Sequence, residues 1–396
     1  MPETGGRRQS TRFLLLYALA VAGGAVAYVP FLTILLPVRV EAMAGEASVG
    51  WLAYAAFCGA IAASLAAIAF GWLSDITRNR RGWIGAGMAM SCGLLLALRG
   101  VGDLPTLLVL LVAWQLALNM MLAPLAAWAG DTVPDHQKGT LGGLLAFSPA
   151  LGALAGALVT IPGLADADTR MALVAGLVAL CVLPALIFGR PRHFCELMQS
   201  RPVTKARALQ PRRIVARMWL ARLLLQIAEA ALFAYLYLWL RSIAPGIGDN
   251  YAARVFSVVL LVAVPLTLAV GRWADRMDRP ILPLSVSAGG SAAALGVMAL
   301  AETLPVALAG YAVFGLSAGV FLALHSAQTL RVLPCPETRG RDLGLFNLTN
   351  TVPSPIMSVL TLALVPVFGF SGLFIMLAVL AGLSCLLLVT TKLPAY

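Results

Sequence analysis

The chain is poor in charged residues. Charged side chains make up 11% of its 396 residues and hydrophobic side chains 60%, whereas about a quarter of the residues in a typical soluble domain are charged. No soluble fold could bury this much apolar surface, so the composition indicates that lipid is the solvent for most of the chain. The mean hydropathy of +0.90 agrees with this interpretation.

Patterns that carry catalysis are also missing from the sequence. The six cysteines have neither disulfide nor metal-ligand spacing. No glycine-rich loop precedes a basic residue in the P-loop pattern, and no nucleophile stands beside a plausible base. We therefore expect no enzyme activity, no catalytic residue, no metal and no cofactor, and ATP hydrolysis has no support.

Long apolar runs, by contrast, recur along the whole chain. About 20 apolar residues cross the bilayer core as a helix. Runs of this kind lie at 13–38, 49–72, 83–99, 104–128, 140–162, 171–189, 215–241, 252–271, 281–301, 304–330, 342–367 and 371–391. The first run exceeds a signal-peptide core and lacks a clear cleavage site, so it is interpreted as an uncleaved helix.

The basic residues favour one side of these twelve spans. Most of the 28 Lys and Arg fall on the side of both termini, eight of them near the longest loop, 190–214. The positive-inside rule then places both termini in the cytoplasm. The net charge of +11 is attributed to the basic loops. We therefore expect no nucleic-acid partner, and contact between the loops and anionic lipid is compatible with this charge.

Two stretches of sequence repeat about 200 positions apart. Gly71-Trp72-Leu73-Ser74-Asp75, followed by arginines, is matched by Gly271-Arg272-Trp273-Ala274-Asp275, also followed by arginines. Pro134 and Pro334 follow the fourth and tenth spans and are likewise 200 apart. Matched landmarks of this kind indicate a duplicated membrane bundle, and such bundles usually form a substrate site where the halves meet.

These landmarks resemble the major facilitator superfamily. Gly71, Leu73, Asp75 and Arg80 match the family's loop between its second and third helices. The resemblance implies an all-α membrane protein with twelve transmembrane helices as two six-helix pseudo-symmetric halves, 1–189 and 215–396, joined by the basic linker 190–214. It also implies secondary transport of a small-molecule substrate by alternating access. We expect a monomer in a bacterial inner membrane.

A narrower similarity points to glycoside-pentoside-hexuronide and sucrose-type transporters. Ser74-Asp75-Ile76-Thr77-Arg78, and Gly340-Arg341-Asp342-Leu343-Gly344 before the eleventh span, are similar to stretches of those proteins. Sodium–sugar symporters of this group carry acidic residues in their second helix, and 49–72 contains none. Proton coupling is therefore expected rather than sodium coupling.

The repeated hairpins are candidates for a cytoplasmic gate. A carboxylate at the C-terminal end of a helix is disfavoured by the helix dipole, so Asp75 should seek a cation or a helix N-terminus nearby. Resemblance to the family implies a gate role. The alternative is that these charges only set topology. The gate candidates are Asp75, Arg78, Arg80, Arg81, Asp275, Arg276 and Arg279.

The seventh span carries the most informative intramembrane charge. Glu229 lies near the middle of 215–241, and an ionisable residue at that depth is a functional candidate. Helical spacing places Arg222, Gln226, Glu229, Phe233 and Tyr237 on one face. Glu229 could load and release a proton, contact substrate directly, or form a structural pair with Arg222.

Other polar residues in the spans are weaker candidates for the lining of a substrate cavity. They are Tyr28 in the first span, Gln115 and Asn119 in the fourth, and Asn347, Asn350 and Thr351 in the eleventh. Amides in membrane helices often only join helices, so that interpretation stays open for them.

The sequence thus favours a proton-coupled secondary transporter, with symport of a sugar-like or glycoside-like solute as the leading hypothesis. Because the spans contain few polar groups, proton-antiport efflux of a drug-like or amphiphilic compound is the alternative. A membrane assembly factor or sensor that transports nothing is the third hypothesis.

Overall fold

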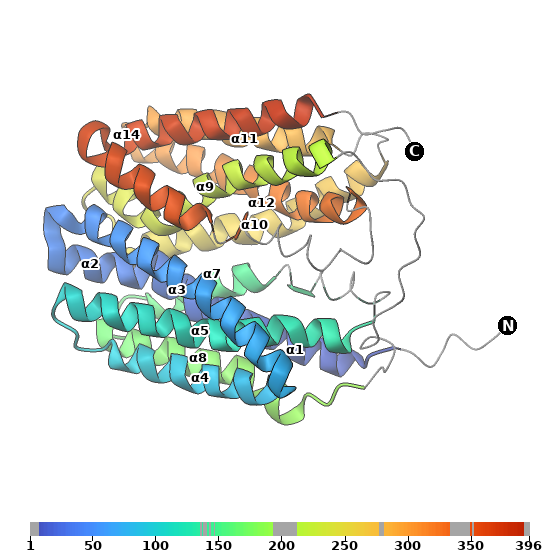
Figure 1. Cartoon of the computed structure of the whole chain (residues 1–396). Helices are drawn as coiled ribbons and strands as arrows, with labels where there is room; N and C mark the ends of the chain where they lie inside the picture. The colour runs from blue at the N-terminus through green and yellow to red at the C-terminus, as the bar shows by residue number, and fades with distance from the viewer. Residues whose placement is uncertain are drawn as a thin grey trace. The chain divides into compact units, whose positions relative to one another are not determined.

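The computed structural model describes residues 8–134, 137, 141, 144–145, 147–192, 212–276, 281–332, 349–350 and 352–391, apart from the side chains of a few helical residues at 212–215, 272–276 and 326–332. The regular elements of these residues are helices (Figure 1). In the first part of the chain they are α1 (Thr11–Pro30), the π-helical η1 (Phe31–Leu35), α2 (Leu36–Ala44), η2 (Gly45–Ala47), α3 (Ser48–Thr77), α4 (Arg80–Ala97), α5 (Leu104–Thr132), α7 (Ser148–Val159) and α8 (Ala167–Phe188). The second part holds α9 (Arg212–Ile243), α10 (Asp249–Arg276), α11 (Leu282–Ala299), α12 (Leu304–Val332) and α14 (Pro353–Val389).

These helices agree with the twelve expected membrane spans. Eight stretches of the described residues are long and apolar enough to cross a membrane. The first of them, Thr11–Thr77, contains spans one and two, and the last, Pro353–Val389, contains spans eleven and twelve. The shorter helices α4 and α7 supply spans three and five.

The last two spans are separated by one glycine. Gly369 has φ +64° and ψ −169° inside α14, a backbone conformation that side chains with a Cβ rarely adopt. The chain doubles back there, so that α14 appears as two antiparallel segments in Figure 1. The expected boundary between spans, near 367–371, therefore coincides with the break.

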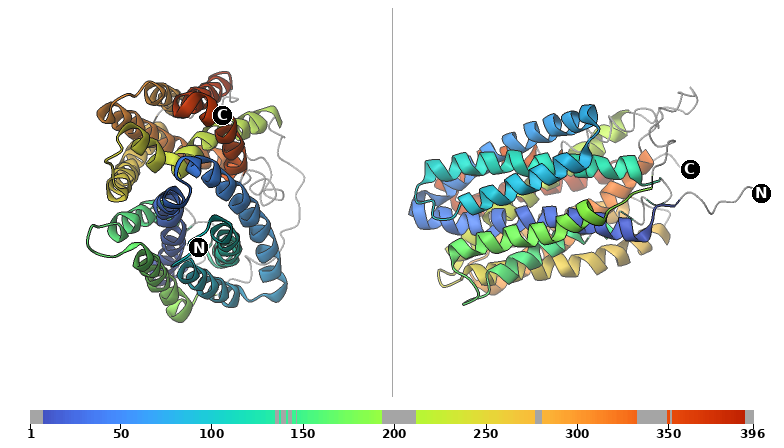
Figure 2. Two further views of the ribbon diagram at one scale, coloured as in Figure 1. Left: turned by 90° about the vertical axis from the view of Figure 1, so that its left-hand side faces the viewer. Right: turned by 90° about the horizontal axis from the view of Figure 1, so that it is seen from below.

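The chain divides into two compact units, which are described separately. Unit 1 comprises residues 1–45 and 58–200, and unit 2 comprises residues 46–57 and 201–396. The helices of each unit run along a common direction, which the end-on view of Figure 2 makes visible. Of the predicted linker 190–214, residues 193–211 lie outside the described chain.

The duplication seen in the sequence is also present in the packing within each unit. In unit 1, α1 packs on α8, and α4 packs on both α5 and α8. In unit 2, the corresponding helix α9 packs on α14, and α11 packs on both α12 and α14. Even single backbone bonds recur, since Leu107 N donates to Asp103 O and Ala307 N donates to Thr303 O.

Aromatic and small residues form the core of unit 1. Phe13 packs edge-on against Trp128, with ring centroids 5.2 Å apart, and the Tyr17 hydroxyl donates to Leu125 O at 2.9 Å. A Cβ at Gly152 of α7 would lie 2.8 Å from Ala25 O of α1. The absence of a side chain at Gly152 therefore allows α7 to pack closely on α1.

Candidate functional site

The polar face of α9 is the centre of the candidate site. α9 has 32 residues. With a rise of about 1.5 Å per residue, Glu229 lies roughly 25 Å from its first residue and Arg222 roughly 15 Å from it. Arg222, Gln226 and Glu229 are all partly buried, and their spacing of four and three residues keeps them on one face.

Asn350 joins this face from a segment distant in the sequence. Arg222 Nε donates to Gln226 Oε1 at 3.1 Å, and Arg222 Nη2 donates to Asn350 Oδ1 at 3.3 Å. Gln226 Nε2 donates to the same Asn350 oxygen at 2.8 Å. Three side chains predicted to line the site therefore form one hydrogen-bonded group, which we call the Arg222 cluster.

Glu229 interacts electrostatically with this group. It interacts with Arg222 through their opposite charges and also with the buried Tyr311 hydroxyl of α12. The described bonds of Arg222 to Gln226 and Asn350 end on neutral amide oxygens. Glu229, when ionised, carries a charge opposite to that of Arg222.

His325 of α12 lies against α9 near the Arg222 cluster. His325 is fully buried, and its Nε2 lies 2.9 Å from Met218 O of α9. A carbonyl oxygen only accepts, so Nε2 carries a proton in this contact. The ring of Phe321 lies 5.4 Å from that of His325, and His325 interacts electrostatically with Arg222.

The other residues predicted on α9 lie outside the hydrogen-bonded group. Phe233 packs edge-on against Phe256 of α10, with centroids 6.0 Å apart. Tyr237 is 1% exposed, and its hydroxyl accepts a bond from Arg241 at 2.5 Å. Because Tyr237 is fifteen residues beyond Arg222, it contributes to the far end of the helix.

The amides predicted in unit 1 lie on α5 and contact residues of the same unit. Asn119 Nδ2 donates to Gln115 O at 2.9 Å within the helix. The Gln115 side chain packs on α3, where a Cβ at Gly59 would lie 3.3 Å from Gln115 Nε2. Tyr28 is partly buried on α1. Asn347, Thr351, Arg279 and the side chains of Asp275 and Arg276 lie outside the described residues.

The first predicted gate hairpin is built around Arg80. Arg80 pairs with Asp75 at the end of α3 and with Asp131 at the end of α5, where Nε and Oδ2 are 2.9 Å apart. Arg81 donates to Leu186 O of α8, and Arg78 is exposed with φ +50°. These contacts join α3, α4, α5 and α8 within unit 1, and the gate role stays a prediction.

Sequence reasoning missed Asp131 and Gln9. Asp131 is one of only 17 acidic residues, and this rarity was the available signal. Gln9 is buried just before α1 and gave no signal. Its Nε2 donates to Thr132 O at 2.9 Å and to Arg192 O at 3.1 Å, while its Oε1 accepts from Arg192 N at 3.0 Å. One amide therefore links the ends of α1, α5 and α8.

The helices and the Arg222 cluster together define a class of protein. Within the described residues, no group of three or more His, Cys, Asp or Glu side chains could hold a metal ion. Repeated apolar helices with a cluster of charged and amide side chains on a membrane-spanning helix are typical of a polytopic membrane transport protein.

The sequence comparison supplies the family. The model described as Major Facilitator Superfamily matches residues 13–334 and, in a second match, residues 218–395. The chain therefore belongs to the major facilitator superfamily. No curated protein sequence matches it significantly, and the narrower similarity to sugar transporters stays a prediction.

A solved structure shows the same fold. The crystal structure of the human organic anion transporter MFSD10 (TETRAN) superposes with a TM-score of 0.64 at 15% sequence identity. The match covers 95% of this chain and 99% of the human one. At this identity the match establishes the fold, and the family membership establishes membrane transport in general.

Proposed function

We propose that this protein is a secondary transporter that moves a small organic anion together with a proton by alternating access. The observation that carries the proposal is the Arg222 cluster, in which the guanidinium is bonded to Gln226 and Asn350 and interacts electrostatically with the Glu229 carboxyl group. Arginine binds carboxylates through two parallel hydrogen bonds, which suits it to an anionic solute.

Charge balance provides the coupling. Net charge inside the membrane is costly, so the cluster is most stable when its charges sum to zero. Ionised Glu229 balances Arg222 when no solute is bound. Protonation of Glu229 leaves one positive charge, which a bound anion neutralises. Proton and anion therefore favour each other's binding and travel in the same direction.

Two similarities support an acidic solute. The structurally similar human protein is described as an organic anion transporter. The sugar-transporter resemblance of the sequence includes hexuronides, which are acidic sugars. A carboxylated sugar satisfies both the arginine and the amides, whereas a neutral sugar leaves the charge of Arg222 unused.

Proton-antiport efflux of an amphiphilic cation is the second candidate function. It is favoured by the aromatic pair Phe233 and Phe256, one turn beyond Glu229. A lipophilic cation could pack on these rings and pair with the Glu229 carboxylate. Cation and proton would then compete for the same carboxyl group, and they would move in opposite directions.

The proposal includes the setting of the protein. The excess of basic residues in the loops supports cytoplasmic termini. We expect a monomer in a bacterial inner membrane. The proton gradient supplies the energy.

Purified protein in proteoliposomes tests the proposal. Uptake of glucuronate and benzoate, of glucose and lactose, and of tetraphenylphosphonium would be followed with and without an imposed pH gradient. We expect uptake of at least one of the two anions to be accelerated when the outside is acidic. Cation movement against the proton gradient would favour efflux, and uptake of neutral sugars alone would favour the sugar hypothesis. If no solute moves although the protein is folded, the transport proposal fails and the sensor or assembly hypothesis gains.

A further inference from the structure

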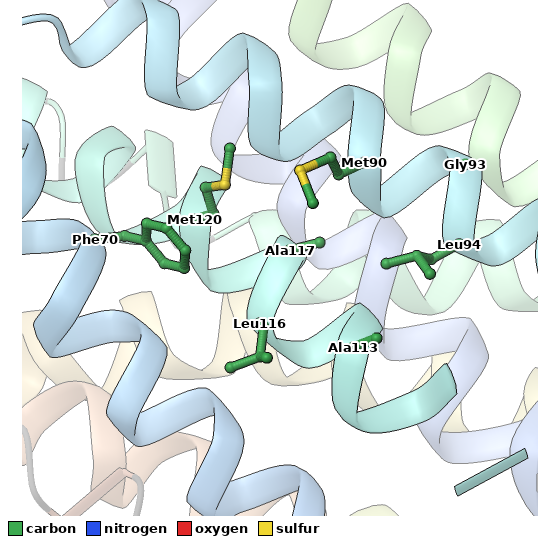
Figure 3. Close-up of a pocket in the computed structure, with 8 residues that line it drawn as sticks. All are labelled: Phe70, Met90, Gly93, Leu94, Ala113, Leu116, Ala117 and Met120. Carbon is green, nitrogen blue, oxygen red and sulfur yellow. The ribbon is translucent and has the colours of Figure 1, made fainter. Parts of the chain in front are cut away.

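An apolar groove opens in unit 1. Its volume is about 430 Å³, within the range of about 300–1,000 Å³ typical of ligand sites. Phe70 of α3, Met90 and Leu94 of α4, and Leu116 and Met120 of α5 line it (Figure 3). The lining side chains are all apolar, so water gains no hydrogen-bonding partner from them.

Small residues keep the groove open. Gly93 lies in its wall, and a Cβ at that position would meet nothing within 4 Å. The rim is exposed, since Met90 is 53% exposed and Leu116 is 39% exposed. These residues belong to the helices assigned to spans two, three and four, so an exposed apolar groove between them suits a lipid chain.

We propose that the groove holds one acyl chain of an anionic glycerophospholipid from the leaflet at the basic end of unit 1. Lipid tails are as apolar as leucine, so the driving force cannot be transfer from water. It comes from dispersion contacts that the lining atoms would lose if the groove were empty. An acyl chain is flexible and thin enough to fill such a space.

The basic end of unit 1 supplies the site for the head group. Phe70 lies seven residues before Thr77, roughly 10 Å along the helix. Beyond it stand Arg78 and Arg81, both exposed. The nearby carboxylates, Asp75 and Asp131, are both paired with Arg80. Three arginines against two carboxylates leave a positive surplus, which attracts an anionic head group.

Trp83 marks the interface between head group and tail. Its ring centroid lies 5.5 Å from that of Phe70 at the groove, and its Nε1 donates to Thr77 Oγ1 at 2.8 Å. Tryptophan favours the membrane interface because one edge is polar and the rest is apolar. The order of groove, Trp83 and arginines matches the order of tail, glycerol and head group in one phospholipid.

Lipid binding to the purified full chain tests this inference. Native mass spectrometry would measure retention of palmitoyl-oleoyl phosphatidylglycerol and of phosphatidylcholine with the same chains. Gly93→Phe fills the groove and is expected to weaken binding of both lipids about tenfold. Gly176→Phe on α8 is the matched control, because Gly176 is also exposed and its Cβ would also meet nothing within 4 Å.

The head-group site is tested separately. Arg78→Gln is expected to reduce the preference for phosphatidylglycerol over phosphatidylcholine about threefold, with retention of phosphatidylcholine unchanged. If Gly93→Phe retains lipid as well as Gly176→Phe does, the proposed site is wrong. It is equally wrong if the wild-type chain retains neither lipid.

A second measurement does not depend on how the variants fold. Phosphatidylglycerol with a diazirine on its oleoyl chain would be photolysed in the wild-type complex. We expect adducts on the peptides that contain Met90, Leu94 and Leu116. Adducts distributed over all lipid-facing helices, without enrichment in these peptides, would overturn the proposal.

Discussion

Arg80 and Asp131 form an ion pair that joins the start of α4 to the end of α5, with 2.9 Å between Nε and Oδ2. The same guanidinium also pairs with Asp75 at the end of α3. The Arg80 side chain is 15% exposed, whereas the two carboxylates are 39% and 62% exposed. One arginine thus neutralises two carboxylates that each stand at the C-terminal end of a helix, where the helix dipole disfavours a negative charge.

Loss of either carboxylate should weaken this junction modestly. We expect Asp131→Asn to lower stability by about 0.5–1 kcal/mol, because the pair is partly solvated. Asp75→Asn should slow turnover more than it weakens substrate binding. The effects of Asp75→Asn and Asp131→Asn on stability should be non-additive, since both carboxylates pair with Arg80. Thermal unfolding and transport kinetics would measure these effects.

Asp103→Asn provides the control for that experiment. Asp103 caps the N-terminal end of α5, the helix whose other end carries Asp131. Its Oδ1 accepts a hydrogen bond from Thr106 N at 2.9 Å, and asparagine caps a helix equally well. Its turnover should equal that of the wild type. Additive effects of the Asp75 and Asp131 changes would show that Arg80 does not couple them.

Glu229→Gln should remove proton coupling. The amide has nearly the same shape but cannot exchange a proton, so acceleration of uptake by a pH gradient should fall at least about tenfold. Exchange of solute without a gradient should persist, because the neutral amide does not change the positive charge of Arg222, which attracts the anion. Exposed Glu302→Gln is the matched control. Undiminished gradient dependence in Glu229→Gln would rule out this carboxyl group as the coupling site.

Arg222 should discriminate between anionic and neutral solutes. Arg222→Lys keeps the charge but loses the planar fork, and we expect the KM for an anion to rise about tenfold. Arg222→Gln should abolish anion uptake. Arg217→Gln near the start of the same helix removes an exposed arginine bonded to Thr390 O and should leave the KM unchanged. Equal KM values for Arg222→Lys and the wild type would show that the fork does not bind the solute.

Gln9→Ala should destabilise unit 1. The change leaves Thr132 O and Arg192 O without the bonds that Gln9 Nε2 donates, and an unsatisfied buried polar group costs about 1–3 kcal/mol. Ser64→Ala is the control, because the Ser64 hydroxyl donates within its own helix to Ala60 O. Detergent-solubilised protein should unfold at a lower temperature in the first variant and not in the second.

Asp166 should make α8 sensitive to acid. Hydrogen bonds from Thr169, one of them from its backbone N–H to Asp166 Oδ1 at 2.7 Å, lower the pKa of this capping carboxyl below its usual value of 3.8. The stabilisation is therefore present above about pH 4 and is lost as the pH falls through the lowered pKa. Asp166→Asn should remove that part of the acid dependence. Hydrogen exchange at the start of α8 would report it, and identical acid dependence in both proteins would contradict the assignment.

Much of the fold could be derived from the sequence because membrane helices satisfy their own backbone within one apolar segment. Length and hydropathy suffice to place such spans, and the 200-residue repeat reveals the duplication. Span five was predicted at 140–162, and the described helix α7, Ser148–Val159, lies within it. The last two spans were predicted separately, at 342–367 and 371–391, and the positive φ of Gly369 breaks the helix between them.

The candidate site could be predicted only in part. Helical periodicity placed Arg222, Gln226 and Glu229 on one face, and the structure shows the first two bonded to each other. Periodicity says nothing about contacts between helices. The hydrogen bond between Arg222 and Asn350 therefore required the packed structure.

The sequence alone determined that this protein is a duplicated membrane bundle with a charged face deep in its seventh span, because hydropathy and spacing are local properties of the chain. The tertiary structure decided which partners those charges have. Arg80 forms an ion pair with Asp131, and Arg222 donates a hydrogen bond to Asn350. Gln9 donates hydrogen bonds to backbone oxygens at the ends of two other helices. Each pairing joins residues far apart in the sequence, and only packing of the helices brings such groups within hydrogen-bonding distance.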